Sequence, residues 1–408
     1  PTFRRQRQMC IRDRGINEAH DAGKKFFVAT NILPHTAKIK TFMEDMAPII
    51  EMKPDALIMA DPGLIMMIRE KWPEVPIHLS VQANTLNSPS VRFWQSVGVE
   101  RIILSRELSL EEVAEIRDEC PDVELEVFVH GSLCIAYSGR CLLSGYFNHR
   151  DPNQGTCTNS CRWNYKVKNN EDTLGIENTG VWKPEAGDIT SQQYLIEEQG
   201  RPGEFMPIEE DEHGTYIMNS RDLRAVEHVH RLVDIGVDCL KIEGRTKSYY
   251  YTARTTQIYR QAIDDAVSGK SFDPHLMTEL ESLAHRGYTD GFFERHAPQE
   301  MQRYRDSSSR SQRQIFSGEV LEFDADSSRI LVDIKNKITV GDEMELLTSD
   351  GNYQFVLNKL TDRRGNDVEC APGSGHQVWI DIEDSIDSVD LGLLCRVQSE
   401  EEARINID

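Results

Sequence analysis

Basic side chains are scarce in this chain: its 408 residues include 46 Lys and Arg against 68 Asp and Glu, a formal net charge of −22. Contacts from Lys and Arg to phosphates dominate the affinity of proteins for nucleic acids. This excludes a general nucleic-acid-binding surface and leaves RNA binding to a local basic patch. The acidic excess is concentrated from Ile315 to Asp408, where 21 acidic and 8 basic residues leave a net charge of −13. Solubility is the simplest explanation of that acidic segment.

The sequence also lacks an apolar run near the roughly 20 residues that a membrane-spanning helix needs, and no signal peptide opens it. We therefore expect no membrane association and a cytoplasmic location, where thiols stay reduced. The nine cysteines are an odd number, and five of them are scattered: Cys10, Cys120, Cys239, Cys370 and Cys395. In a reducing compartment, the other four are better explained as a metal site than as disulfides.

Two common functional motifs are missing. There is no HExxH sequence, and His228 and His230 are only two positions apart, which argues against the metal-binding helix of a zinc peptidase. No GxGxxG follows the first strand-like segment, which argues against a dinucleotide-binding sheet.

Four cysteines are concentrated in one segment, with the spacings C-x6-C, C-x15-C and C-x3-C: Cys134, Cys141, Cys157 and Cys161. Four thiolates are the full protein ligand set of a cubane iron–sulfur cluster and also of a closed zinc site. Structural zinc sites usually contain two short C-x2-4-C hooks, and only Cys157 and Cys161 resemble one. We therefore predict an iron–sulfur cluster of the [4Fe-4S] type. Zinc and unrelated reduced cysteines are the alternatives.

Seven apolar, β-branched segments alternate with amphipathic stretches over the first 250 residues. One such stretch, Leu110–Glu119, follows a Ser109–Glu112 capping box and is predicted to be a helix. Alternating strands and helices indicate a parallel sheet that is covered on both faces. The predicted strands are Phe26–Ile32, Ala56–Asp61, Ile77–Gln82, Arg101–Arg106, Leu125–Gly131, Tyr216–Ser220 and Cys239–Gly244.

Polar or ionisable residues end almost every predicted strand, as they do at the active face of a (β/α)8 barrel. We therefore predict an α/β fold of the TIM-like (β/α) barrel type. Seven strands are one short of closure, so the first βα unit is expected to be missing. The predicted barrel covers residues 15–300 and carries a cysteine-rich insertion at 131–215.

The remaining segments have different patterns. Residues 1–14 show neither a strand pattern nor a helical face, and we interpret them as a foreign leader. Residues 301–314 are rich in Ser and Arg and are predicted to be a linker. Residues 315–400 contain short alternating runs separated by turn residues, which predict a small all-β barrel.

Residues 126–144, EVFVHGSLCIAYSGRCLLS, match every fixed position of a family signature, E-x-F-x2-G-S-L-C-x4-G-x-C-x-L-S. On this signature the chain resembles the collagenase-like peptidase family of unknown catalytic type. Further similarity lies at Cys239–Arg245 and at His285–Phe292 (HRGYTDGF). The segment DPNQGTCTNSCRW at 151–163 resembles a bacterial branch of this family that hydroxylates the wobble uridine of tRNA to 5-hydroxyuridine with prephenate. The resemblance thus implies a tRNA-modifying hydroxylase, with tRNA and prephenate as partners.

Several strand-end residues are candidates for catalysis or for binding the small co-substrate. Arg106 and Arg245 end predicted strands and are candidates to bind the carboxylates of prephenate. Ion pairs of these arginines with Glu107 or Glu243 are the alternative. Lys241 and Glu243 are candidate catalytic groups or a structural pair inside the barrel. His130 is a candidate proton donor near the cluster, or a hydrogen-bond donor to a loop carbonyl.

The other candidates concern RNA. Gln82 and Asn84 carry amide groups that match a uracil edge. Asn219 is a further candidate for substrate binding, and Lys247 is a candidate contact to tRNA. Two other functions stay open: a peptidase that uses residues outside the cluster, and a binding or maturation subunit in which the cluster only organises a surface. The sequence does not set the oligomeric state.

Overall fold

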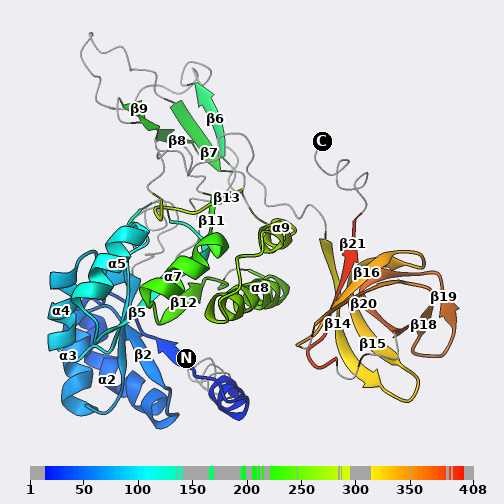
Figure 1. The fold of residues 1–408 in the computed structure, drawn as a ribbon, viewed down its shortest axis with the longest axis horizontal. Coiled ribbons are helices and arrows are strands. Elements are labelled where there is room, and N and C mark those ends of the chain that lie inside the picture. Colours follow the sequence, from blue (N-terminus) through cyan, green and yellow to red (C-terminus); the bar gives the residue numbers. More distant parts are fainter. Residues whose placement is uncertain are drawn as a thin grey trace. The chain divides into compact units, whose positions relative to one another are not determined.

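The computed structural model (Figure 1) describes residues 14–134, 136–138, 140, 221–245, 247–283, 285, 287–294, 314–349, 351–382, 386 and 389–398, and the backbone of short strands between 165 and 215. The chain divides into two compact units. The first contains Pro1–Glu243 and Arg286–Ser308, and the second contains Gly244–His285 and Ser309–Asp408. Residues 1–13 of the expected leader and 301–313 of the expected linker lie outside the described residues, so those two expectations stay predictions.

The first unit contains an eight-stranded sheet in the order β1-β2-β3-β4-β5-β11-β13, in which β12 also pairs with β5. Strands β1 to β5 are parallel neighbours, and β12 is parallel to β5. The strands are β1 (Phe27–Ala29), β2 (Ala56–Met59), β3 (Ile77–Leu79), β4 (Arg101–Ile103), β5 (Glu124–Ser132), β11 (Asp222–Arg224), β12 (Cys239–Ile242) and β13 (Tyr288–Thr289).

Side-chain caps start the helices that follow β2, β3 and β4. The Asp61 carboxylate accepts a hydrogen bond from the Leu64 amide, and the Asn87 side chain accepts one from the Ser90 amide. The predicted helix Leu110–Glu119 and its Ser109–Glu112 capping box are both confirmed. The helices of this unit include α2 (Thr36–Glu51), α3 (Pro62–Lys71), α4 (Ser88–Ser96), α5 (Leu110–Glu119) and α7 (Val229–Ile235).

Central strands of this sheet are buried on both faces, as predicted for a parallel sheet. Every residue of β3 and β4 is buried. Val81, Ile103, Phe128 and Leu223 form one buried apolar cluster, and Ile58 packs against it. Burial of such side chains is the main stabilising term of the unit, at about 1.5–3 kcal/mol for each large apolar side chain.

The expectation of a wholly parallel sheet is wrong at β11, which runs antiparallel to the end of β5. Parallel neighbours need a crossover connection, usually a helix, whereas the described segments between β5 and β11 are short strands. The predicted strand Tyr216–Ser220 lies outside the described residues. Among the described residues, β1 pairs only with β2, so closure into a barrel stays a prediction.

The expected insertion 131–215 contributes two small antiparallel sheets, one of β6, β7 and β8 and one of β9 and β10. Their strands are β6 (Tyr165–Asn169), β7 (Tyr194–Glu198), β8 (Phe205–Ile208), β9 (Glu210–Asp211) and β10 (Gly214–Thr215). No helix in the part of the chain that the structure describes is long and apolar enough to cross a membrane.

The second unit joins two helices, α8 (Tyr249–Val267) and α9 (His275–Glu281), to an eight-stranded antiparallel sheet in the order β17-β16-β21-β14-β15-β20-β18-β19. A separate all-β domain at the C-terminal end was predicted and is confirmed. Its closure into a barrel stays a prediction. The strands are β14 (Gln314–Asp324), β15 (Arg329–Thr339), β16 (Glu343–Leu347), β17 (Asn352–Val356), β18 (Leu360–Asp362), β19 (Asp367–Val368), β20 (Cys370–Asp381) and β21 (Leu393–Val397).

Candidate functional site

Arg106, in the loop after β4, lies at the centre of a polar cluster at the carboxyl end of the sheet. Its guanidinium forms an ion pair with Glu243, Nη2 to Oε2 2.7 Å, and lies 3.7 Å above the ring centroid of Phe128. Its Nη1 is 3.7 Å from Cys134 Sγ and 3.3 Å from Ser138 Oγ. The side chain of Arg106 is only 7% exposed, so these contacts hold its charge in a largely dry environment.

The Arg106–Glu243 ion pair is one of the alternatives expected from the sequence. A carboxylate of a substrate that binds Arg106 would therefore compete with Glu243. Paired charges that are partly buried are costly to separate, because the remaining charge loses its partner without regaining water. The Arg106 N–H donates toward the Cys134 sulfur. A thiolate would be stabilised there.

Asn84 connects this cluster to the end of β3. Its backbone is left-handed, with φ 51°, after a short 3-10 turn over Val81–Ala83. Its Nδ2 donates to the Gln82 carbonyl oxygen at 3.2 Å and to the Ser138 carbonyl oxygen at 2.5 Å. The Asn84 amide therefore holds the segment that follows Cys134. A role of Gln82 and Asn84 in contacting uracil stays a prediction.

Gly131 lets β5 approach the residue after β12. It has φ +114°, and a Cβ added there would lie 2.6 Å from the Glu243 carbonyl oxygen and 2.9 Å from Glu243 Cβ. No side chain can occupy that space without moving backbone. The glycine of the family signature thus places Glu243 within reach of Arg106.

His130 lies inside the sheet, one residue before Gly131. It is 1% exposed, and its ring centroid is 5.5 Å from that of Tyr288. A role of His130 as a proton donor stays a prediction. Its burial means that any proton transfer would occur away from bulk solvent.

Lys241 does not pair with Glu243, which corrects one of the expected pairings. Its Nζ donates to Glu126 Oε1 at 2.7 Å, and Arg101 Nη1 lies 3.4 Å from the other carboxylate oxygen of Glu126. Strand β12 ends at Ile242, and its register with β5 shifts between Lys241 and Ile242. Glu243 therefore lies beyond the strand, on the side of Arg106. The Lys–Glu pair inside the sheet exists, but with Glu126 as the acid.

Two further groups near Glu126 are held in their neutral forms. Burial, together with the nearby charge of Arg101, lowers the pKa of His78 to about 4. Burial, together with the charge of Glu126, raises the pKa of Cys239 to about 12. The Cys239 thiol therefore stays protonated at neutral pH and is unsuited to bind metal or to act as a nucleophile. Glu126 was missed as a site residue, although it is the first fixed residue of the family signature.

The second unit carries Arg245, which is exposed, and Lys247, whose Nζ lies 4.7 Å from the ring centroid of Tyr251. Cys141, Cys157, Cys161 and Asn219 lie outside the described residues. Cys134 is exposed at the end of β5 and has a cationic donor beside it, which suits a thiolate ligand. The donor chemistry at this position thus fits an iron–sulfur cluster. Ser138, which the sequence did not single out, lies between the first two cysteines of the motif.

Comparison with known proteins agrees with the signature around Cys134. The sequence model of Peptidase family U32 matches residues 11–303, and that of the Peptidase family U32 C-terminal domain matches residues 312–392. The chain belongs to peptidase family U32. The resemblance expected from the sequence is thereby confirmed.

Two bacterial relatives in this U32 family align over nearly the whole chain. The chain is 55% identical over 401 residues to the tRNA hydroxylation protein P of Escherichia coli, covering 96% of this chain and 88% of that protein. It is 52% identical to the tRNA hydroxylation protein P of Haemophilus influenzae, covering 94% and 86%. A more distant relative, 25% identical over 88% of this chain and 48% of its own length, is the 23S rRNA 5-hydroxycytidine synthase of Escherichia coli.

Proposed function

We propose that this U32 family member is an RNA hydroxylase that converts the wobble uridine of tRNA to 5-hydroxyuridine. The observation that carries the proposal is the near full-length similarity to proteins named for tRNA hydroxylation. A distant relative is named for forming 5-hydroxycytidine in rRNA, so names that refer to RNA hydroxylation recur among the relatives of this chain. Prephenate as co-substrate and a [4Fe-4S] cluster are the finer parts of the proposal and are supported by the sequence motifs.

Cys134, Cys141, Cys157 and Cys161 would hold the cluster, which would supply redox chemistry when bound. Arg106 would act on it through its N–H directed at Cys134 Sγ, because hydrogen bonds to cluster sulfurs tune the reduction potential. Glu243 holds the Arg106 guanidinium in that orientation. The chain's own contribution is thus a fixed positive charge beside a thiolate.

Substrate binding is assigned to the polar residues that end the strands. Uracil has to leave the base stack before its C5 can react, and amide groups such as those of Gln82, Asn84 and Asn219 match its edge. Prephenate carries two carboxylates, and a guanidinium group such as that of Arg245 or Arg106 suits the binding of a carboxylate by paired hydrogen bonds. Lys247 would contact the RNA backbone. His130, Lys241 and Glu243 are the proposed acid–base groups.

Nucleoside analysis tests the proposed reaction. Cells that lack this protein are expected to lose 5-hydroxyuridine from their tRNA, and expression of the chain is expected to restore it. The measurement is mass spectrometry of tRNA digested to nucleosides, with a second modified nucleoside as internal control. Peptide cleavage by the cluster-loaded protein, without any 5-hydroxyuridine, would instead favour the peptidase alternative.

The Arg245→Ala variant tests the carboxylate-binding role. Loss of a charge-assisted hydrogen bond costs about 1.5–3 kcal/mol, which corresponds to about a 10- to 150-fold higher KM for prephenate. The variant should keep its iron content and its tRNA affinity, and excess prephenate should restore product. Arg260→Ala is the matched control, because Arg260 is an exposed arginine of the same unit that pairs with Asp264. An unchanged KM in Arg245→Ala would place the carboxylate site elsewhere.

A further inference from the structure

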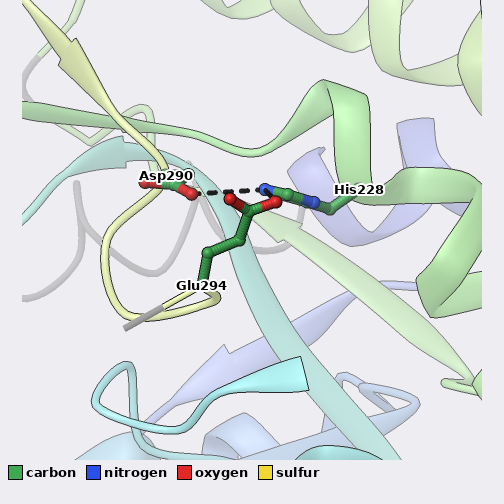
Figure 2. Close-up of side chains that lie close together, drawn as sticks. All are labelled: His228, Asp290 and Glu294. Carbon is green, nitrogen blue, oxygen red and sulfur yellow. Dashed lines mark hydrogen bonds and ion pairs between the residues drawn. The ribbon is translucent and has the colours of Figure 1, made fainter. Parts of the chain in front are cut away.

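Three side chains that the proposed reaction does not use converge in the first unit. His228 ends a 3-10 turn over Val226–His228 that leads into α7, Asp290 directly follows β13, and Glu294 lies four residues further on. Figure 2 shows the carboxylates of Asp290 and Glu294 beside the imidazole of His228. One donor atom from each residue lies within 4.8 Å of the others. Asp290 belongs to the HRGYTDGF segment that the family resemblance singled out.

These donors lie further apart than the two groups of a short charge-assisted hydrogen bond. His228 Nε2 is 3.4 Å from Asp290 Oδ2 and 4.0 Å from Glu294 Oε1. A charge-assisted hydrogen bond is usually about 2.7–2.9 Å long. Consider two ligand atoms that each lie about 2.1 Å from the same metal ion. If the ligand–metal–ligand angle is about 90–150°, the two ligand atoms lie about 3.0–4.1 Å apart. The observed distances fall within the range that a shared metal ion sets.

The surroundings of His228 favour a cation. The side chains of His228 and Asp290 are 10% and 11% exposed, while Glu294 is 56% exposed and leaves the group open on one side. Glu227, the preceding residue, adds a third carboxylate close enough to act on the imidazole. Burial by itself would lower the pKa of His228, but the hydrogen bond to Asp290 and the three negative charges outweigh it and raise that pKa.

Packing fixes the two segments that supply the donors. The Phe293 carbonyl oxygen accepts a hydrogen bond from the Leu110 amide at 3.2 Å, at the first turn of α5. The Phe293 ring contacts the His228 ring edge-on, with centroids 5.8 Å apart. The Ala225 amide donates to the Val129 carbonyl oxygen of β5 at 2.9 Å. The donors are thus held by the sheet and by α5, so little ordering is needed for an ion to bind.

We propose that His228, Asp290 and Glu294 form a binding site for a divalent first-row transition-metal cation, separate from the cysteine cluster. One imidazole nitrogen and two carboxylate oxygens suit ions such as Mn²⁺ or Fe²⁺ better than a soft ion that prefers thiolate ligands. Water molecules would complete the coordination on the open side. The ion would join the segment after β13 to the start of α7, two parts of the chain 62 residues apart at His228 and Asp290. The proposal is independent of the hydroxylase function.

The probe is Mn²⁺, because it is a hard ion with little affinity for the cysteine thiolates or their cluster. The cluster-loaded protein is freed of loosely bound metal with EDTA, desalted and titrated with MnCl2. Free Mn²⁺ is followed by its EPR signal, and bound manganese is counted after gel filtration. The variants are His228→Gln and Glu294→Gln. His20→Gln is the matched control, because His20 pairs with Asp55 at a normal 2.9 Å and is not part of a three-donor group among the described residues.

The expected result is one Mn²⁺ per chain, bound at least about tenfold more weakly by His228→Gln and Glu294→Gln and equally well by His20→Gln. Mn²⁺ should also raise the Tm of the unaltered protein and of His20→Gln, but not that of Glu294→Gln. Glu294 is more than half exposed, so its variant should fold even if His228→Gln does not. No saturable binding, or equal binding by the unaltered protein and Glu294→Gln, would overturn the proposal and leave a simple ion pair.

Discussion

Cys134→Ser is expected to give a colourless protein that contains no iron–sulfur cluster and forms no 5-hydroxyuridine. The unaltered protein, purified without oxygen, should be brown and contain iron and sulfide at about four per chain each. A serine hydroxyl is a poor ligand for iron, so a cluster with three remaining thiolates should not survive purification. Iron and sulfide analysis and the visible absorption spectrum provide the measurement.

Cys370→Ser is the matched control for this experiment. Cys370, at the start of β20, is exposed like Cys134 but belongs to the C-terminal unit and not to the cysteine-rich segment. It should keep its full iron content and activity. Stoichiometric zinc without iron in the unaltered protein, or unchanged iron in Cys134→Ser, would rule out the proposed cluster at these cysteines.

Gly131→Ala is expected to destabilise the first unit strongly. Alanine at φ +114° is strained, at about 1–3 kcal/mol, and its Cβ would meet the Glu243 carbonyl oxygen at 2.6 Å, with an overpacking cost of about 1–3 kcal/mol. The two costs together predict a loss of about 2–6 kcal/mol in the free energy of unfolding. Urea-induced unfolding of the two proteins, followed by circular dichroism, measures the difference.

Gly236→Ala separates the two costs. Gly236, at the end of α7, also has a positive φ, +83°, but no atom of the described residues lies within 4 Å of the position of an added Cβ. It should therefore show only the backbone strain. If Gly131→Ala were no more destabilised than Gly236→Ala, the close approach of β5 and Glu243 would not constrain the site. If it were more destabilised, iron content should fall too, because Cys134 follows Gly131 by three residues.

Much of the local structure could be predicted from the sequence because its causes are local. The Ser109–Glu112 capping box and the spacing of the apolar residues after it predict the helix Leu110–Glu119, and both depend only on residues within about one helical turn of each other. Strands β2, β3 and β4 begin at the residues where their apolar segments begin. The signature around Cys134 was sufficient to identify the family, since its fixed residues all lie within the short segment 126–144.

Contacts between distant segments could not be predicted in the same way. Strict alternation along β12 predicts that Lys241 and Glu243 lie on the same face of the strand. In the structure the register of β12 with β5 shifts after Lys241, and Lys241 pairs with Glu126 while Glu243 pairs with Arg106. The same limit applies to β11, whose direction depends on how the chain returns from the insertion.

By itself, the sequence determined the family, the helices and strands with clear periodicity, the separate C-terminal β-domain and the four cysteines as the main chemical feature. Only the tertiary structure decided that Arg106 lies between Glu243 and Cys134, and that His228 lies beside Asp290 and Glu294. The physical reason is that periodicity and capping act over a few residues. The partner of a buried charge is set instead by strand order and register, which bring together residues 28, 62 or 137 positions apart.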